Sequence, residues 1–262
     1  MKHPLKTAAG VLAASSLIFA LAAEDAPKAP RPGAPAGGAS KLRVLIVTGD
    51  DVPAHDWKET TPITREILEK SGRFEVRVSE KPADLAAEDL SAVDVVILSF
   101  RDGPGREVPE SARKKLLDFV ASGKGLVAVH FAVAAMREWK EYAGLVGRVW
   151  VPRKSGHGPR GVFKVSVTRK DHPITAGLPD FEADDELYAA LEGAKELNVL
   201  ATAHSADFSK KDEPMAWTLD APKGRVFVTV LGHDAKARRH PAFGTLLARG
   251  AEWAATGKVT LR

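Results

Sequence analysis

Short apolar runs that stop at turns and alternate with helical patterns constrain the fold of this chain more than any other feature. The first half reads as predicted strands at 42–47, 74–78, 93–99 and 125–130, with amphipathic helices at 62–70 and 109–122. Strands that are apolar on both faces, such as LRVLIV at 42–47, are typical of a sheet buried between layers of helices. The pattern therefore predicts an α/β fold with a mostly parallel sheet and helices on both faces. The first helix is expected to begin at Pro62, with Thr61 as its N-cap.

The second half of the chain predicts a less regular continuation of the same domain. Strands are expected at 162–167, 199–203, 215–218 and 225–230, and a closing helix at 243–255. The turn at 222–224, between the last two strands, favours an antiparallel hairpin on or near the sheet edge. There is no internal repeat, so we expect one domain over residues 41–262.

The first 40 residues differ in composition from the rest of the chain. Residues 1–22 carry two lysines and then an apolar run of 15 residues that ends in Ala-Leu-Ala. This pattern is typical of a secretory signal peptide, so we expect an exported protein, periplasmic or extracellular, with no stable membrane span after cleavage. A membrane anchor is the alternative, although the run is shorter than the ~20 residues that cross a bilayer. Residues 23–40 are rich in Pro, Ala and Gly and are expected to form a flexible linker.

Two features of the composition exclude whole classes of function. The chain has no Cys, which excludes thiol nucleophiles, disulfides and Cys-based zinc sites. Its net charge of +4 is the balance of 38 basic and 34 acidic residues with no long basic run, so we expect no nucleic-acid partner.

Histidines follow predicted strands at the edge where an open α/β sheet binds its ligands. His55, His130 and His233 each lie beyond a predicted strand, and His157 lies in a Gly-rich segment. One strand-end His is usually structural, but three from distant segments favour a common site. Imidazoles move protons near neutral pH or bind metals, so all four are catalytic candidates, and His130 and His233 are also candidate ligands of a divalent metal, Zn²⁺ first. No pair of histidines has the H-x-x-x-H spacing of a helical metal site, so acid–base catalysis without a metal is an alternative.

Carboxylates and aromatic rings in the same segments are candidates for substrate binding. The carboxylates are Asp185, Glu186 and Asp234. They would orient the histidines or contact sugar hydroxyls, and a cap at a helix or turn start is an equal alternative for the pair at 185–186. The aromatic candidates are Trp57, Trp139 and Tyr142. Such rings stack on sugars, with core packing as the alternative.

An ordered set of motifs resembles the ThuA-like, or trehalose-utilisation, family from about Lys41 to Thr256. The segments that carry the resemblance are GLVAVH at 125–130, WKEY at 139–142, His157, DHPITAGLP at 171–179, DELY at 185–188, GRVF at 224–227, LGHD at 231–234 and RGAEWA at 249–254. The resemblance implies a flavodoxin-like fold similar to that of class I glutamine amidotransferases. In those enzymes a Cys nucleophile stands at an elbow that corresponds to the segment Val129-His130-Phe131, so the absence of Cys excludes amidotransferase chemistry.

The resemblance also implies a role in carbohydrate metabolism. The family is associated with the use of disaccharides through 3-keto sugars, which partner oxidoreductases make. Family members usually carry a small residue where this chain has Phe131, and the larger ring is expected to narrow the pocket.

Two functions agree with these residues. The first is an enzyme, a keto-sugar isomerase, lyase or hydrolase, in which a His or carboxylate base removes a proton next to a carbonyl group, with or without a metal. The second is a non-catalytic carbohydrate-binding module on a degenerate amidotransferase-like scaffold. In both, the direct partner is a small-molecule sugar, and a sugar oxidoreductase is expected in the same pathway.

Overall fold

Five strands with buried, mostly branched side chains form the parallel half of the sheet. β1 (Leu42–Val47) lies between β2 (Phe74–Ser79) and β3 (Val95–Leu98), and β3 continues to β4 (Gly125–Val129) and β13 (Arg225–Thr229). The middle strands have almost no exposed surface, because helices cover both faces. The strand pattern of the first half therefore gave the parallel sheet correctly.

Four further strands extend the sheet by antiparallel pairing. They are β12 (Asp212–Asp220), β11 (Asn198–His204), β7 (Gly161–Val167) and β8 (Phe181–Asp185). The full order is β2-β1-β3-β4-β13-β12-β11-β7-β8. The β12–β13 hairpin is antiparallel as predicted, but its predicted place at the edge is wrong. β13 pairs with β4 on its other side and β12 pairs with β11, so β8 and β2 form the edges.

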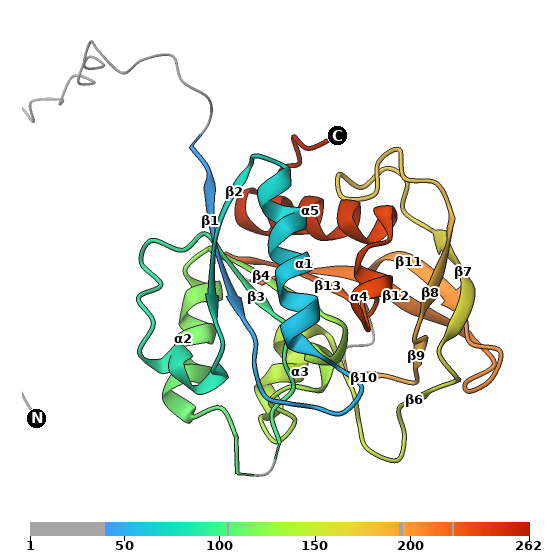
Figure 1. Ribbon diagram of the computed structural model, residues 1–262, viewed down its shortest axis with the longest axis horizontal. Coiled ribbons are helices and arrows are strands. Elements are labelled where there is room, and N and C mark those ends of the chain that lie inside the picture. The colour runs from blue at the N-terminus through green and yellow to red at the C-terminus, as the bar shows by residue number, and fades with distance from the viewer. Residues whose placement is uncertain (1–39, 104, 194–195, 222) are drawn as a thin grey trace, which may run out of the picture. The chain divides into compact units, whose positions relative to one another are not determined.

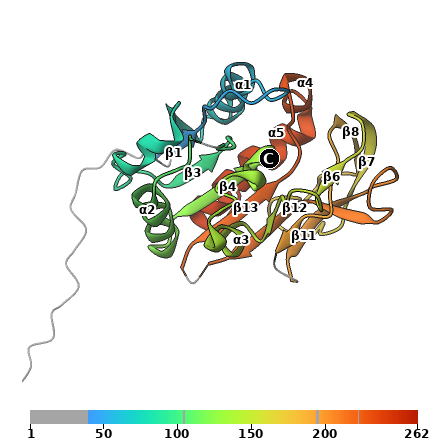
Figure 2. The same cartoon turned by 90° about the horizontal axis from the view of Figure 1, so that it is seen from below.

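The helices form two layers. They are α1 (Trp57–Lys70), α2 (Glu110–Ala121), α3 (Lys140–Val146), α4 (Ala235–Arg238) and α5 (Pro241–Thr256). α5 packs along β3, β4 and β13 and also contacts α1. Figure 2 shows α1 and α4 on one side of the sheet and α2 and α3 on the other. The expected arrangement, with helices on both faces, is confirmed.

Helix α1 begins five residues before the predicted start. Asp56 is its N-cap, and the Asp56 carboxylate accepts hydrogen bonds from the backbone N–H groups of Lys58 and Glu59. Pro62 therefore lies inside the helix, and Thr61 turns inward to share a hydrogen bond with Thr48. A carboxylate that satisfies two free N–H groups is a stronger start signal than the Thr-Pro pair.

Short elements complete the domain (Figure 1). They are the 3-10 helices η1 (Pro82–Ala86) and η2 (His130–Ala134) and the two-residue strands β5 (Arg148–Val149), β6 (Gly156–His157), β9 (Tyr188–Ala189) and β10 (Glu192–Gly193). The computed structural model describes residues 40–103, 105–193, 196–221 and 223–262, so the predicted signal peptide at 1–22 and linker residues 23–39 lie outside it. In the part that is described, no helix has both the length and the apolar character needed to cross a membrane.

Candidate functional site

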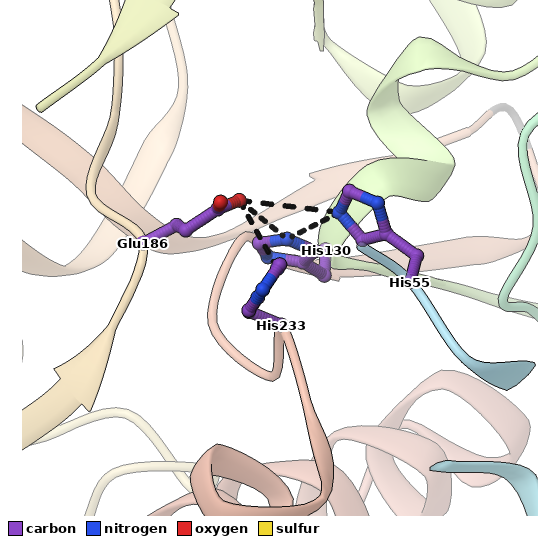
Figure 3. Close-up of side chains that lie close together, drawn as sticks. All are labelled: His55, His130, Glu186 and His233. Carbon is purple, nitrogen blue, oxygen red and sulfur yellow. Dashed lines mark hydrogen bonds and ion pairs between the residues drawn. The ribbon is translucent and has the colours of Figure 1, made fainter. Parts of the chain in front are cut away.

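Three histidines and one glutamate converge at the carboxyl edge of the parallel strands (Figure 3). His55 comes from the loop between β1 and α1, His130 directly follows β4, His233 follows β13, and Glu186 follows the antiparallel strand β8. One donor atom from each side chain lies within 4.8 Å of the others. The prediction that His55, His130 and His233 share one place is therefore met by the geometry.

His130 is fixed in one orientation at the base of this cluster. Its side chain is fully buried, and its backbone has a φ of 50°, in the left-handed region that side chains rarely adopt. Its Nδ1 lies 2.7 Å from the carbonyl oxygen of Val230. Because a carbonyl only accepts hydrogen bonds, Nδ1 carries a proton, and Nε2 faces the cluster.

His55 faces His130 through the same type of atom. The two Nε2 atoms are 3.2 Å apart, and the His55 ring stacks on Phe131 at 4.6 Å between ring centres. Burial, together with the charges of His130 and His233, lowers the pKa of His55 to about 3, so this ring is neutral at pH 7. Phe131 is itself buried, and what it does here is hold His55 in place.

His233 is positioned by a buried carboxylate. Asp185 accepts hydrogen bonds from the backbone N–H groups of Gly232 at 2.6 Å, His233 at 3.0 Å and Glu186 at 2.8 Å. Gly232 has a φ of 100°, and a Cβ there would lie 2.6 Å from the ring of Phe243. The Asp185 carboxylate is thus buried and accepts its hydrogen bonds from backbone N–H groups, which contradicts its predicted contact with sugar hydroxyls. Its hydrogen bond to the N–H of His233 agrees with the predicted role of orienting a histidine.

Glu186 is the carboxylate that faces the imidazoles. Its Oε2 lies 3.1 Å from His233 Nδ1, 3.4 Å from His130 Nε2 and 3.9 Å from His55 Nε2. Burial opposes ionisation, but the attraction of His130 and His233 outweighs it and lowers the pKa of Glu186; the same attraction outweighs burial at His233 and raises its pKa. Glu186 Oε2 and His233 Nδ1 are nevertheless buried without a hydrogen-bond partner among the described residues.

These distances fit a metal ion. A tetrahedral Zn²⁺ site with bonds of about 2.1 Å places its ligand atoms about 3.4 Å apart. Four of the six separations among the donor atoms of His55, His130, Glu186 and His233 run from 3.1 to 3.9 Å, and all six lie within 4.8 Å. Buried polar atoms without partners are rare and costly, and a cation at the centre of the cluster satisfies them together. The group is therefore compatible with metal binding, and Glu186 joins the predicted ligands.

His157 lies at the rim of the same cluster. It is exposed, its Nδ1 donates a hydrogen bond to the carbonyl oxygen of Gly158, and its Nε2 lies 3.8 Å from Glu186 Oε1. It belongs to the short strand β6, which pairs with β9. The Nε2 atom of His157 is therefore free to exchange protons with solvent or a ligand.

A cleft of about 650 Å³ opens beside the cluster. His55 and His233 form part of its wall, between the loop that precedes α1 and the loop that leads into α4. Its polar lining includes Asp51, Asp56, Lys58, Glu59 and Asp234. The cleft thus brings water-exposed hydrogen-bonding groups next to the two outermost imidazoles.

Several predicted substrate contacts are not brought to this cleft. Tyr142 is fully buried and its hydroxyl donates to the carbonyl oxygen of Ala132, so its predicted stacking on a sugar is wrong. Trp139 packs against Tyr142 and lines a separate cavity of about 140 Å³. Trp57 is half-buried at the start of α1, where its Nε1 donates to Asp51. Core packing, the alternative weighed for these rings, accounts for Tyr142, and sugar stacking by Trp57 and Trp139 stays a prediction.

Asp234 lines the cleft but belongs to an ion-pair network. Its carboxylate caps α4 through the N–H of Ala237 and pairs with Arg160 at 2.7 Å. Arg160 also pairs with Asp184. Asp234 is therefore a wall residue whose charge is already matched.

The sequence did not single out Tyr188. Its hydroxyl lies 3.4 Å from His55 Nε2, and its ring lies 4.4 Å from that of His130. The available signal was its position two residues after Glu186, since alternate residues of an extended segment share a face.

Comparison with known proteins agrees with this architecture. A family profile described as trehalose utilisation, ThuA, matches residues 43–254. No curated protein sequence matches the chain. The crystal structure of a ThuA-like protein from Parabacteroides merdae is 30% identical, with a TM-score of 0.76, over 85% of this chain and 93% of the other. A ThuA-like protein from Bacteroides uniformis is 19% identical, with a TM-score of 0.66, over 87% of this chain and 98% of the other.

A more distant likeness concerns the fold alone. A β-galactosidase from Bacillus circulans is 16% identical, with a TM-score of 0.54, over 80% of this chain and 30% of that longer one. The flavodoxin-like architecture that the motifs implied is confirmed. With the profile match and the 30% identical structure together, the chain belongs to the ThuA, or trehalose-utilisation, family.

Proposed function

We propose that this protein is a metal-dependent enzyme that acts on a sugar carrying a carbonyl group. The observation that supports this most directly is the group of four donor atoms from His55, His130, Glu186 and His233, spaced as the ligands of one ion and partly without other partners. The metal expected there is Zn²⁺, because three imidazoles and one carboxylate suit it and no thiolate competes. Family membership points to carbohydrate as the substrate class.

The proposed substrate is a 3-keto glycoside or disaccharide. The carbonyl at C3 acidifies the C–H bond at C2, and the glycosidic oxygen at C1 is β to that carbonyl. When bound, the ion would supply positive charge that stabilises the oxygen on which negative charge develops. A base near the ion is then enough to begin elimination at C1.

His157 is the proposed base. Its Nε2 would remove the C2 proton, and the electron pair of the broken C–H bond would form the C1–C2 double bond as the C1–O bond breaks. The departing oxygen would take the proton back from His157, which leaves an unsaturated keto sugar and an alcohol. Addition of water to the double bond would make the overall reaction a hydrolysis. His157 suits this role because its Nδ1–H is held by Gly158, which leaves Nε2 free at the rim.

The cleft supports a ligand of disaccharide size. Its volume of about 650 Å³ lies within the usual range for small-molecule sites, and its wall reaches His55 and His233. Asp51 and Lys58 lie at its mouth with exposed side chains that can hydrogen-bond to sugar hydroxyls. A 3-keto substrate requires an oxidoreductase that oxidises the C3 hydroxyl beforehand, and we place both reactions outside the cytoplasm because of the pattern at residues 1–22.

The test uses full-length protein purified without an affinity tag. Metal content is measured before and after chelation, and turnover is followed on a C3-oxidised glucoside with and without added Zn²⁺. We expect about one ion per chain, loss of turnover on chelation and recovery with Zn²⁺. His130→Ala and His233→Ala should lose both metal and turnover.

The matched control is His204→Ala. His204 is an exposed imidazole at the end of β11 that pairs with Asp212 and is not a member of the four-residue cluster. This variant should keep the metal and the turnover of the wild type. Sugar binding without turnover of any keto sugar would overturn the proposal in favour of the carbohydrate-binding module, and turnover that survives complete removal of metal would overturn the metal's role.

A further inference from the structure

The hydroxyl of Tyr188 is next to a proposed metal ligand and has no other use in the fold. It lies 3.4 Å from His55 Nε2, which is its hydrogen-bond partner among the described residues. The Tyr188 side chain is buried, and its ring packs against His130 at 4.4 Å and Trp150 at 4.9 Å. These contacts hold the ring rigidly, so the hydroxyl cannot swing away to solvent.

The hydrogen bond between Tyr188 and His55 cannot coexist with a metal on His55. Either the phenol donates to the lone pair of Nε2, or a protonated Nε2 donates to the phenol oxygen. Nitrogen bound to a metal has neither a free lone pair nor a proton. Whichever tautomer His55 adopts, coordination through Nε2 therefore releases the Tyr188 hydroxyl.

A released hydroxyl at this position needs a new partner. Leaving a buried O–H group without a hydrogen bond is costly. The Tyr188 hydroxyl lies next to His55 Nε2, which is a proposed ligand atom. The nearest new acceptor is therefore an oxygen of a molecule that binds to the ion from the cleft.

The strand pairing gives Tyr188 and His157 complementary places. Tyr188 on β9 faces His157 on β6 in the register of the short ribbon, and their rings are nearly parallel at 5.8 Å. Both side chains flank Glu186, Tyr188 on the buried side and His157 on the exposed side. The proposed base and the Tyr188 hydroxyl therefore stand on paired strands beside the same carboxylate.

We infer that Tyr188 is a catalytic residue whose hydroxyl, freed when His55 binds the ion, donates a hydrogen bond to the substrate oxygen at the metal. The inference rests on the proposed function and adds a residue to it. Tyr142 provides an internal contrast, because it is the other tyrosine of the chain and its hydroxyl is permanently engaged by Ala132.

The first experiment is kinetic. Tyr188→Phe removes the hydroxyl and keeps the ring, so bound Zn²⁺ should remain at the wild-type ratio while kcat on a C3-oxidised glucoside falls by about 10²-fold or more, with KM changed only a few-fold. Tyr142→Phe is the matched control and should keep kcat within about threefold of wild type. An unchanged kcat in Tyr188→Phe would overturn the inference.

The second experiment does not depend on activity. Full-length protein labelled with 3-fluorotyrosine should give two ¹⁹F resonances, which Tyr142→Phe assigns. Addition of Zn²⁺ alone should shift the Tyr188 resonance and leave that of Tyr142 in place. Zn²⁺ that binds without moving the Tyr188 resonance would overturn this inference alone, whereas failure of the wild-type protein to bind any Zn²⁺ would overturn the proposed metal site and this inference with it.

Discussion

Two buried glutamates in this protein have opposite surroundings. Glu252, on α5, accepts hydrogen bonds from the Thr260 N–H at 2.8 Å, the Thr260 hydroxyl at 2.6 Å, the Leu261 N–H at 3.1 Å and Arg73 Nε at 2.9 Å. Glu186 faces three imidazoles, and its Oε2 has no hydrogen-bond partner within the described part of the chain. A buried carboxylate whose hydrogen bonds are all made stabilises the fold. A buried carboxylate that lacks hydrogen bonds and faces imidazoles is arranged to hold a ligand that the chain itself does not supply.

Replacing Glu186 should have the largest effect on ligand binding. Glu186→Gln keeps the shape but removes the charge, so Zn²⁺ affinity should fall at least about 100-fold, since losing even the outer contacts of a ligand typically costs 10–100-fold. The chelated variant should unfold only slightly below chelated wild type, because the charge it loses is attracted by His130 and His233 but satisfied by no hydrogen bond from the described residues. Competition with a chromophoric chelator and thermal unfolding measure the two quantities. Equal Zn²⁺ affinity, or a large loss of metal-free stability, would erase the contrast with Glu252.

Removing the charge of Asp185 should have an intermediate effect. Asp185 touches only backbone N–H groups, including that of His233, so Asp185→Asn should misplace this ligand and weaken Zn²⁺ binding by about 10–100-fold. Asp184→Asn, one residue earlier and paired with Arg160, is the control and should bind Zn²⁺ as wild type does. The same chelator competition decides, and an Asp185→Asn protein with normal affinity would show that Asp185 acts on the fold only.

The opposite result is expected at Glu252. Glu252→Gln turns an acceptor toward backbone N–H groups into a donor, which should cost about 2 kcal/mol of unfolding free energy and lower Tm by several degrees. Metal content and turnover should stay at wild-type values. Calorimetry together with metal analysis would contradict the comparison if stability were unchanged or if metal were lost.

The smallest expected effect is the pH dependence of the stability that Glu252 contributes. Burial opposes ionisation of Glu252, but the hydrogen bonds from Thr260, Arg73 and Leu261 outweigh it and lower its pKa below the ordinary value of 4.5. A carboxyl whose pKa is lowered by folding stabilises the protein above its unfolded pKa and loses that contribution as pH falls through the folded one. The stability gap between wild type and Glu252→Gln should therefore be constant from about pH 7 to pH 5 and shrink below pH 4.5. Urea unfolding at several pH values measures it, and a gap that persists in acid would assign the effect to shape alone.

The parallel half of the fold could be predicted because its signal is local. Runs such as VVIL at β3 and GLVAV at β4 are buried on both faces, and their apolar character is visible without knowing their neighbours. The strand-end rule then placed His130 and His233 at one edge. The β12–β13 hairpin was misplaced because nothing local to it reveals that β11, β7 and β8 extend the sheet beyond it.

The position of Glu186, the fourth member of the cluster, was harder to predict for the same reason. β8 has the sequence FEADD, with alternating exposed and buried residues and two adjacent carboxylates, so it lacks the apolar signature of a strand. Its end reaches the histidines only through antiparallel pairing with β7. Local sequence also could not distinguish the two adjacent carboxylates. The Asp185 carboxylate accepts hydrogen bonds from backbone N–H groups, whereas the Glu186 carboxylate faces the imidazoles.

The origin of the four side chains in the cluster has a consequence for assembly. His55 is synthesised early and His233 near the end of the chain. Glu186 follows β8, which belongs to the antiparallel half of the sheet. An ion held by all four side chains would cross-link segments that span most of the domain. This cysteine-free chain cannot form such a cross-link with a disulfide. Capture of the ion would thus come last, after the entire sheet is built, and a truncated or half-folded chain would have no means to retain it.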